Sequence, residues 1–399
     1  MKVAIIGAGA SGLMAASNLN CETLLFDKNN EIGKKLKITG NSRANITNAR
    51  VYDDFLENII RNKKFFYSSF NNFSNFDTMD FFVNRNLDLL TEENLKVYPI
   101  TNSSKDVINV FRKEISKDNI KLHLNEKVLD VRLDDRFVVE TDKGIYTCDK
   151  VIVATGGLSF KYTGSTGFGY KIAKKFGHTI IDQKPSLTSI IINDRFNFKA
   201  ISLKDVMIKA ESNNKIFEEI GDILISDRFI TGPCVLNLSS KINRLDKIDL
   251  SVDFFYKYDF KDLDNILISI LNKNSNLNIN NAFQSLLPMG IINEILKRSG
   301  IKKSIKANQL KAEDRHSIIT TLKEFKLSFN RLNDTDKAII TSGGVDVKEI
   351  NPSTMESKLV KGIYFIGEVL DLEGLTGGFN LQIAFSSAYS ASCDIRRNG

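Results

Sequence analysis

Three glycines near the N-terminus have the spacing of a phosphate-binding turn. They follow an apolar stretch at 3–6 and precede a run of small residues: Gly7, Gly9 and Gly12. The first permits a tight turn, the second lets a phosphate touch the backbone, and the third lets a helix pack closely on the preceding strand. The helix should begin near Ala10 and Ser11, where unpaired N–H groups and the positive end of the helix dipole favour phosphate. This turn is therefore a candidate site for a dinucleotide pyrophosphate.

An acidic residue and a basic loop follow this turn in the order that a dinucleotide site requires. Asp27 lies 20 residues after Gly7, at the end of a second apolar stretch, where a carboxylate can bind the ribose hydroxyls of adenosine. The loop at 31–48 comes next, and its basic and polar side chains can wrap a pyrophosphate and a sugar chain through charge-assisted hydrogen bonds. The ligands predicted in and before this loop are Lys28, Lys34, Lys35, Arg43 and Asn45.

A segment near the C-terminus supplies a second half of the same site. A strand is expected at 363–366, Glu368 follows it, and two adjacent glycines open a helix at about Asn380. In enzymes that use flavin adenine dinucleotide (FAD), the late acidic residue typically receives the ribityl or pyrophosphate end. The N-terminus of the final helix points at the flavin edge that gains negative charge on reduction. A simple NAD dehydrogenase would not need this element, so the two halves indicate non-covalent FAD. Further predicted cofactor ligands are Val128, Ala154, Thr155, Gly156, Gly367, Asp371, Gly377, Gly378 and Leu381.

The composition is that of an ordinary soluble globular protein. The chain has 399 residues, of which 42% are hydrophobic and 26% charged, enough for two or three domains. It contains no apolar run of about 18 residues and enters its first strand at once, which predicts a cytoplasmic protein without a membrane span or signal peptide. Its four cysteines and three histidines are scattered, which excludes a zinc knuckle or a redox dithiol, and we expect no metal site.

The net charge of +7 gives little information about partners. Lysines and arginines are spread along the chain with acidic residues among them. This pattern favours a solvated surface and a site for a phosphate-bearing cofactor over a nucleic-acid partner. We therefore expect a small-molecule substrate, and the sequence does not indicate an oligomeric state.

The order of apolar segments predicts an α/β protein whose nucleotide-binding domain is interrupted by an insert. The first part of that domain covers 1–187, a β-rich and then helical insert covers 188–330, and the domain is completed by 331–399. Helical spacing occurs at 78–90 and 103–116. Four short strands between 121 and 148 are expected to form an antiparallel hairpin structure crossing over the nucleotide fold.

Taken together, these motifs resemble the NAD(P)/FAD-dependent oxidoreductases of the glutathione-reductase-like FAD superfamily that carry a family-specific insert. This group includes aminoacetone-oxidase-like and bile-acid enone reductase-like flavoproteins. The resemblance covers about half of the chain and implies a Rossmann-like FAD-binding domain. This sequence departs from the family pattern at Ala44, where a cysteine is usual, and at Asp227 and Phe229, near a usual histidine, so chemistry that depends on those residues is not carried over. The segments that carry the resemblance are 7–12, 33–48, 156–169, 343–358 and 367–382.

The chemistry implied is hydride transfer at the flavin N5 atom. The first hypothesis is a reductase of an activated, enone-type C=C bond, fed by NAD(P)H that binds transiently, because no second nucleotide-binding motif follows the first. The alternatives are a flavin-dependent amine or amino-ketone oxidase that uses oxygen, and a flavoprotein that acts on or with RNA. The catalytic residues are not identified by any motif, and the candidates on the substrate side are Arg43, Lys161, Tyr162 and Asp227.

Overall fold

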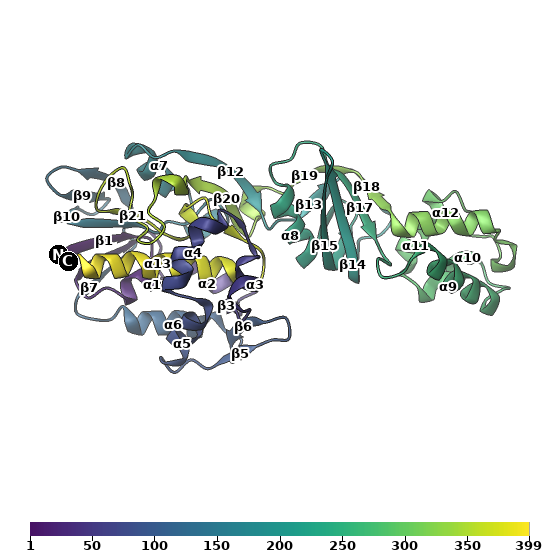
Figure 1. The fold of residues 1–399 in the computed structure, drawn as a ribbon, viewed down its shortest axis with the longest axis horizontal. Helices are drawn as coiled ribbons and strands as arrows, with labels where there is room; N and C mark the ends of the chain where they lie inside the picture. Colours follow the sequence, from purple (N-terminus) through teal and green to yellow (C-terminus); the bar gives the residue numbers. More distant parts are fainter. Residues whose placement is uncertain (399) are drawn as a thin grey trace. The chain divides into compact units, whose positions relative to one another are not determined.

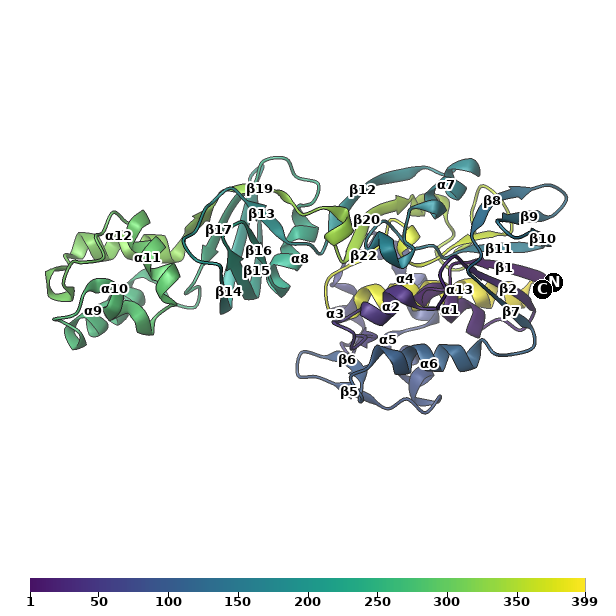
Figure 2. The same cartoon turned by 180° about the vertical axis from the view of Figure 1, so that it is seen from behind.

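The computed structural model describes residues 1–398, which divide into two compact units (Figures 1 and 2). The first, called here the α/β unit, combines 1–185 with the C-terminal segment that begins at 335. The second, the insert, is formed by 186–334. Each unit has its own cluster of buried apolar side chains. The sequence alone predicts these two boundaries at 188 and 330.

A five-stranded parallel sheet forms the centre of the α/β unit and confirms the Rossmann-like fold class. Its first strand is buried over nearly its whole length, as expected for a parallel sheet covered on both faces. Helices α1 (Ala10–Ser17) and α13 (Phe379–Arg397) run side by side next to this sheet (Figures 1 and 2), and the Ser392 hydroxyl donates to the Ala15 carbonyl at 3.1 Å. The spatial order of the strands is β21 (Ile363–Phe365), β11 (Lys150–Val153), β1 (Lys2–Ile6), β2 (Glu22–Asp27) and β7 (Ile120–Leu124).

Two local predictions were wrong in part. Strand β7 pairs in parallel with β2, so it belongs to the central sheet, and only β8 (Val128–Leu133), β9 (Phe137–Thr141) and β10 (Ile145–Cys148) form the antiparallel sheet. Local alternation indicates a strand but not its partner. The helix expected at 78–90 is α5 (Asn75–Val83), which ends before Asn86 takes a left-handed conformation at φ 60°. The helix expected at 103–116 is confirmed as α6 (Ser104–Glu114).

The remaining described elements of the α/β unit are three small sheets, four further helices and several short 3-10 turns. Three small sheets have the orders β3-β6-β5, β22-β4 and β12-β20. Their strands are β3 (Thr47–Asn48), β4 (Ile59–Arg61), β5 (Leu89–Thr91), β6 (Lys96–Pro99), β12 (Ile180–Ser186), β20 (Ile340–Val345) and β22 (Glu373–Gly374). The helices are α2 (Lys34–Ile38), α3 (Tyr52–Leu56), α4 (Lys63–Asn72) and α7 (Phe168–Lys175), with short 3-10 turns at η1 (Lys161–Thr163), η5 (Val347–Glu349) and η6 (Gly367–Val369).

The insert combines a seven-stranded antiparallel sheet with a group of helices. Its long hairpin turns at Asn213 and Asn214, both with positive φ, as a two-residue hairpin turn requires. None of the helices within residues 1–398 is long and apolar enough to cross a membrane. The strands, in spatial order, are β18 (Phe325–Leu327), β17 (Asp249–Asp253), β14 (Ala200–Ser212), β15 (Lys215–Ser226), β16 (Phe229–Thr231), β13 (Ile190–Ile192) and β19 (Phe329–Leu332). Helix α8 (Pro233–Ile242) packs on β15, and beyond the β17–β18 edge lie α9 (Phe260–Lys273), α10 (Ile279–Ala282), α11 (Met289–Arg298) and α12 (Ala312–Lys323) (Figure 1).

A buried histidine joins the end of α7 to the segment that follows β20. His178 lies 3.1 Å from Glu349 through Nδ1 and 2.8 Å from the Ser357 hydroxyl through Nε2, and its ring contacts Phe365. Its side chain is fully buried. Burial lowers the pKa of His178, although the neighbouring Glu349 carboxylate acts in the opposite direction. The neutral imidazole is therefore the form that stabilises this region.

We expect the stability that His178 provides to be lost in acid. Because the folded-state pKa lies below the unfolded value of about 6.5, the contribution is complete above that pH and declines as the pH falls toward the folded-state pKa. His178→Gln should reduce the free energy of unfolding by about 1–3 kcal/mol at pH 7.5, and the gap to wild type should narrow by pH 5.5. Urea unfolding of both proteins between pH 7.5 and pH 5.5 measures this difference in unfolding free energy. A difference that stays constant across this pH range would show that His178 does not titrate in this way.

Candidate cofactor site

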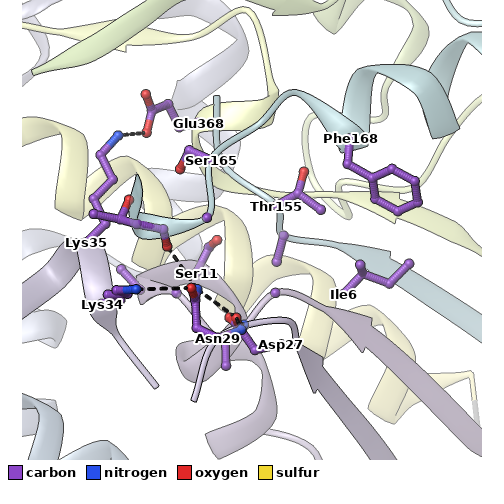
Figure 3. A pocket seen from close by; sticks show the side chains of 18 of the residues that line it. Ile6, Ser11, Asp27, Asn29, Lys34, Lys35, Thr155, Ser165, Phe168 and Glu368 are labelled. Carbon is purple, nitrogen blue, oxygen red and sulfur yellow. Dashed lines mark hydrogen bonds and ion pairs between the residues drawn. The ribbon is translucent and has the colours of Figure 1, made fainter. Parts of the chain in front are cut away.

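A cavity of about 510 Å³ lies within the α/β unit, where β1, β2 and β11 end (Figure 3). Open α/β sheets bind their ligands at the carboxyl ends of parallel strands. The N-terminus of α1 reaches this cavity through Ala10 and Ser11, and the first turn of α13 reaches it through Asn380 and Leu381. Two helix N-termini therefore lie at one cavity, and both favour negative charge.

The glycine turn after β1 is shaped by close backbone contacts. Gly7 has φ +109°, and a Cβ placed there would lie 2.5 Å from the Ala154 carbonyl oxygen. A Cβ on Gly12 would lie 1.8 Å from the Gly7 carbonyl oxygen. A Cβ on Gly9, by contrast, would meet no atom within 4 Å, although Gly9 lines the cavity. Gly7 and Gly12 are required by the fold, whereas Gly9 leaves room for a ligand beside the backbone.

Asp27 fixes the shape of this turn as well as lining the cavity. One carboxylate oxygen accepts the Ala8 N–H at 2.8 Å, and the other accepts the backbone and side-chain N–H groups of Asn29 at 2.8 and 2.9 Å (Figure 3). Burial raises the pKa of Asp27, and these hydrogen bonds oppose that effect. A carboxylate has about four acceptor positions, so one remains for a ribose hydroxyl.

A second polar cluster closes the cavity on the side of η6. Lys35 pairs with Glu368 at 2.6 Å (Figure 3) and also donates to the Ser159 hydroxyl at 2.6 Å. The other oxygen of Glu368 accepts the Thr341 N–H and the Ser159 hydroxyl, both at 3.0 Å. The cluster therefore joins the early basic loop, the middle of the chain and the C-terminal motif.

Among the described residues, two lysines at the cavity form no ion pair, and one buried hydroxyl there has no hydrogen-bond partner. Lys28 donates to Thr166 at 3.1 Å and Lys34 reaches Asn29 at 3.5 Å, but within residues 1–398 neither lysine forms an ion pair. Burial lowers the pKa of Lys28, which the nearby Asp27 carboxylate partly offsets. The buried Thr155 hydroxyl also lacks a hydrogen-bond partner in the described chain. Free positive charge, an unpartnered hydroxyl and the space at Gly9 fit the diphosphate of a dinucleotide.

The structure brings most of the predicted cofactor ligands to this cavity. Lys127, Lys171 and Ile339 also line it and were missed, because no spacing in the sequence relates them to the glycine turn. Ser165 and Thr166 belong to a Gly-Ser-Thr turn whose composition was the available signal. The predicted residues that line the cavity are Gly7, Gly9, Ala10, Ser11, Asp27, Lys28, Lys34, Lys35, Val128, Ala154, Thr155, Gly156, Glu368, Asn380 and Leu381.

The other predicted ligands lie outside the lining and support neighbouring segments. Arg43 stacks on Tyr98 at 3.9 Å and pairs with Glu92 at 2.6 Å. Asp371 pairs with Arg61 and also accepts from Asn62. The rest are Gly12, Asn45, Gly367, Gly377 and Gly378, of which Gly378 packs so closely on strand β3 that a Cβ would lie 2.3 Å from the Thr47 carbonyl oxygen.

The candidate catalytic residues lie outside the lining of the large cavity. Lys161 pairs with Asp336 at 3.3 Å, and Tyr162 is 66% exposed on η1. Asp227 belongs to the insert, where it lines a shallow hollow together with Phe198. With Arg43 held by Glu92, none of the four lines the large cavity. Residues 1–398 also contain no group of three or more His, Cys, Asp or Glu side chains arranged to hold a metal ion.

Comparison with known proteins places the chain in a family. Residues 1–394 match the model described as the HI0933-like protein Rossmann domain. The chain belongs to the HI0933-like family. It is 30% identical to the ribosomal RNA dihydrouridine synthase of Escherichia coli, over 98% of this chain and 97% of that protein. It is 28% identical to the 3-dehydro-bile acid delta(4,6)-reductase of Clostridium scindens, over 98% of each chain.

Solved structures also align over the whole length of this HI0933-like protein. The 3-ketosteroid delta1-dehydrogenase of Sterolibacterium denitrificans aligns with 12% identity and a TM-score of 0.49, covering 100% of this chain and 99% of that chain. Family membership, the glycine turn and the cavity identify the protein as an FAD-dependent oxidoreductase.

Different residues of the cavity would bind different parts of FAD. The amides at the start of α1, with Lys28 and Lys34, would hold the diphosphate, and Asp27 would hold the ribose. The start of α13 brings a positive dipole end to the cavity. FAD, when bound, supplies hydride-transfer chemistry at its N5 atom.

Substitutions at two glycines should separate cofactor binding from folding. Gly9→Val adds a Cβ that would meet no protein atom within 4 Å, so the FAD content of the purified protein should fall at least about tenfold while the apoprotein keeps its stability within about 0.5 kcal/mol. Gly12→Ala meets the Gly7 carbonyl and should cost about 1–3 kcal/mol or more. Flavin absorbance per protein and urea unfolding of the apoproteins measure both. A stable Gly12→Ala apoprotein would contradict the packing role.

Removing Glu368 should destabilise the protein more than removing its lysine partner. Glu368→Ala removes the side-chain acceptor of the Thr341 N–H and leaves the Lys35 ammonium with only the Ser159 hydroxyl, whereas after Lys35→Met the carboxylate keeps the Thr341 and Ser159 donors. We expect a loss of about 1–3 kcal/mol for Glu368→Ala and a smaller loss for Lys35→Met, measured on the apoproteins. Equal losses would indicate that the ion pair alone accounts for the stability of the cluster.

Proposed function

We propose that this protein reduces a carbon–carbon double bond conjugated to a carbonyl group, with NADH or NADPH as the source of the hydride. One observation carries this proposal: the names of the two relatives indicate substrates that both contain this kind of bond. The 3-oxo group of the bile acid is conjugated to its delta(4,6) double bonds, and the uracil double bond that is saturated in dihydrouridine is conjugated to the ring carbonyl. Both relatives align with 98% of this chain.

The chemistry of such a bond matches what the cavity offers. A conjugated carbonyl withdraws electrons, so the β carbon accepts a hydride and the α carbon then takes a proton. The unpaired lysines and the two helix N-termini around the cavity favour a bound anionic cofactor and the negative charge that gathers during reduction. The nicotinamide donor would bind transiently, because the sequence contains one dinucleotide-binding motif.

We infer that the reduced ring is a uracil of a structured RNA. The relative from Escherichia coli supports this, since its name assigns ribosomal RNA and it aligns almost end to end; a relative from Haemophilus influenzae with the same name is 29% identical over 98% of this chain. This inference departs from our expectation of a small-molecule substrate, which came from the scattered charge. A small cyclic enone is the second candidate, favoured by the Clostridium scindens relative.

The test is a reduction assay followed by product analysis. Anaerobic addition of NADH or NADPH should bleach the flavin absorbance, and unmodified ribosomal RNA should then restore it and yield dihydrouridine in digested nucleosides by mass spectrometry. Restoration by a 3-oxo-4-ene steroid but not by RNA would select the second candidate. Flavin that is bleached by amines and restored by oxygen, but not bleached by either nicotinamide, would refute the proposal in favour of an oxidase.

A further inference from the structure

The helical part of the insert carries a lysine surface, defined here as Lys273, Lys302, Lys303 and Lys306. Lys273 ends α9, and the other three lie in the loop between α11 and α12. Backbone hydrogen bonds of 2.9 Å join the two segments, from the Ile279 N–H to the Ile305 carbonyl and from the Ala307 N–H to the Leu277 carbonyl. Positions 277–279 and 305–307 therefore lie side by side, within the group of helices labelled α9 to α12 in Figures 1 and 2.

The fold holds this surface in a defined shape. Helix α11 ends at Arg298, and Gly300, which follows it with φ +75°, turns the chain back. Ile279 and Ala307 are buried and Ile305 is half-buried, so apolar side chains anchor both segments. All four lysines of the surface are exposed. They are presented by an anchored loop pair, and ordering them for a ligand costs little backbone entropy.

Positive charge on this surface is not neutralised by the chain. The sequence contains no Asp or Glu from 265 to 293 or from 295 to 312. Within residues 1–398, none of the four lysines forms an ion pair, whereas the adjacent Lys297 and Arg298 pair with Glu294 and Asp194. The nearest acidic residues downstream are Glu313 and Asp314 at the start of α12, where Asp314 accepts the Lys311 N–H.

Several other basic residues of the insert pair with carboxylates. On the sheet, Lys209 pairs with Glu211 at 3.0 Å, and Lys241 of helix α8 pairs with Glu219 of β15 at 2.5 Å. The insert as a whole therefore carries mixed charge, and the lysine surface is a local concentration that the overall composition conceals. Exposed lysines without carboxylate partners are strongly hydrated point charges suited to phosphate groups.

We propose that the lysine surface binds the phosphate backbone of the RNA substrate. This inference rests on the proposed function, and it assigns to the insert a positioning role that is separate from the FAD cavity. Contacts of this kind fix the position of the nucleic acid and carry no sequence information.

Charge reversal tests the surface against a matched control. Lys302→Glu/Lys303→Glu/Lys306→Glu should weaken binding of fluorescein-labelled ribosomal RNA at least about tenfold at about 100 mM KCl, and should reduce the slope of log affinity against log salt by about 2–3. The control is Lys204→Glu/Lys215→Glu/Lys247→Glu, three exposed lysines of the insert with the same change in net charge, two on strands β14 and β15 and one in the loop before β17. Fluorescence anisotropy measures affinity, and circular dichroism with flavin content verifies folding.

Each outcome decides the proposal. Loss of affinity in the lysine-surface variant alone supports it; equal loss in both triple variants, or no loss in either, overturns it. If the Glu variant does not fold, the corresponding triple Gln variant is measured against the same control. Binding of wild type to phosphatidylglycerol vesicles but not to RNA would also overturn it. Wild-type RNA binding that depends on these lysines, without dihydrouridine formation, would refute the proposed reaction and leave the surface in place.

Discussion

The close approach of three backbone segments at the end of β1 is the constraint on which the cofactor site depends. Gly7 lies against the Ala154 carbonyl at the end of β11, and Gly12 in α1 lies against the Gly7 carbonyl. No side chain fits between these segments, so the start of α1 sits directly above the ends of two parallel strands. Asp27, at the end of β2, accepts the Ala8 N–H and so holds the same turn. The space beside Gly9 exists because these contacts place the turn at the cavity wall.

Around this turn, charged and polar side chains join segments that are far apart in the sequence. Lys35 comes from the early basic loop, Ser159 from the segment after β11, and Glu368 from the C-terminal motif, and their polar groups form one cluster at the cavity. The ion pair is about one-fifth exposed at each side chain, so solvent screens it only in part. The same carboxylate accepts a backbone N–H of β20. Closure of the cavity therefore requires the chain on both sides of the insert.

The insert differs from the α/β unit that it interrupts in its sheet type and in having its own apolar core. Its sheet is antiparallel and alternates buried with exposed residues, and its helices pack around a separate apolar core. It contributes no residue to the lining of the large cavity. The large cavity is therefore lined by residues of the α/β unit alone.

The sequence by itself determined the Rossmann-like fold class and the core of the cofactor site, because the glycine turn, Asp27 and the first turn of α13 are local patterns whose geometry follows from backbone sterics. Strand partners and lateral neighbours were decided only by the tertiary structure. The pairing of β7 with β2, the Arg43–Glu92 contact outside the cavity and the approach of Lys127 to the site all join residues that no short spacing relates. The lysine surface has the same origin. Its charges come from two segments that backbone hydrogen bonds bring together, and a chain-wide net charge cannot report where charges gather in space.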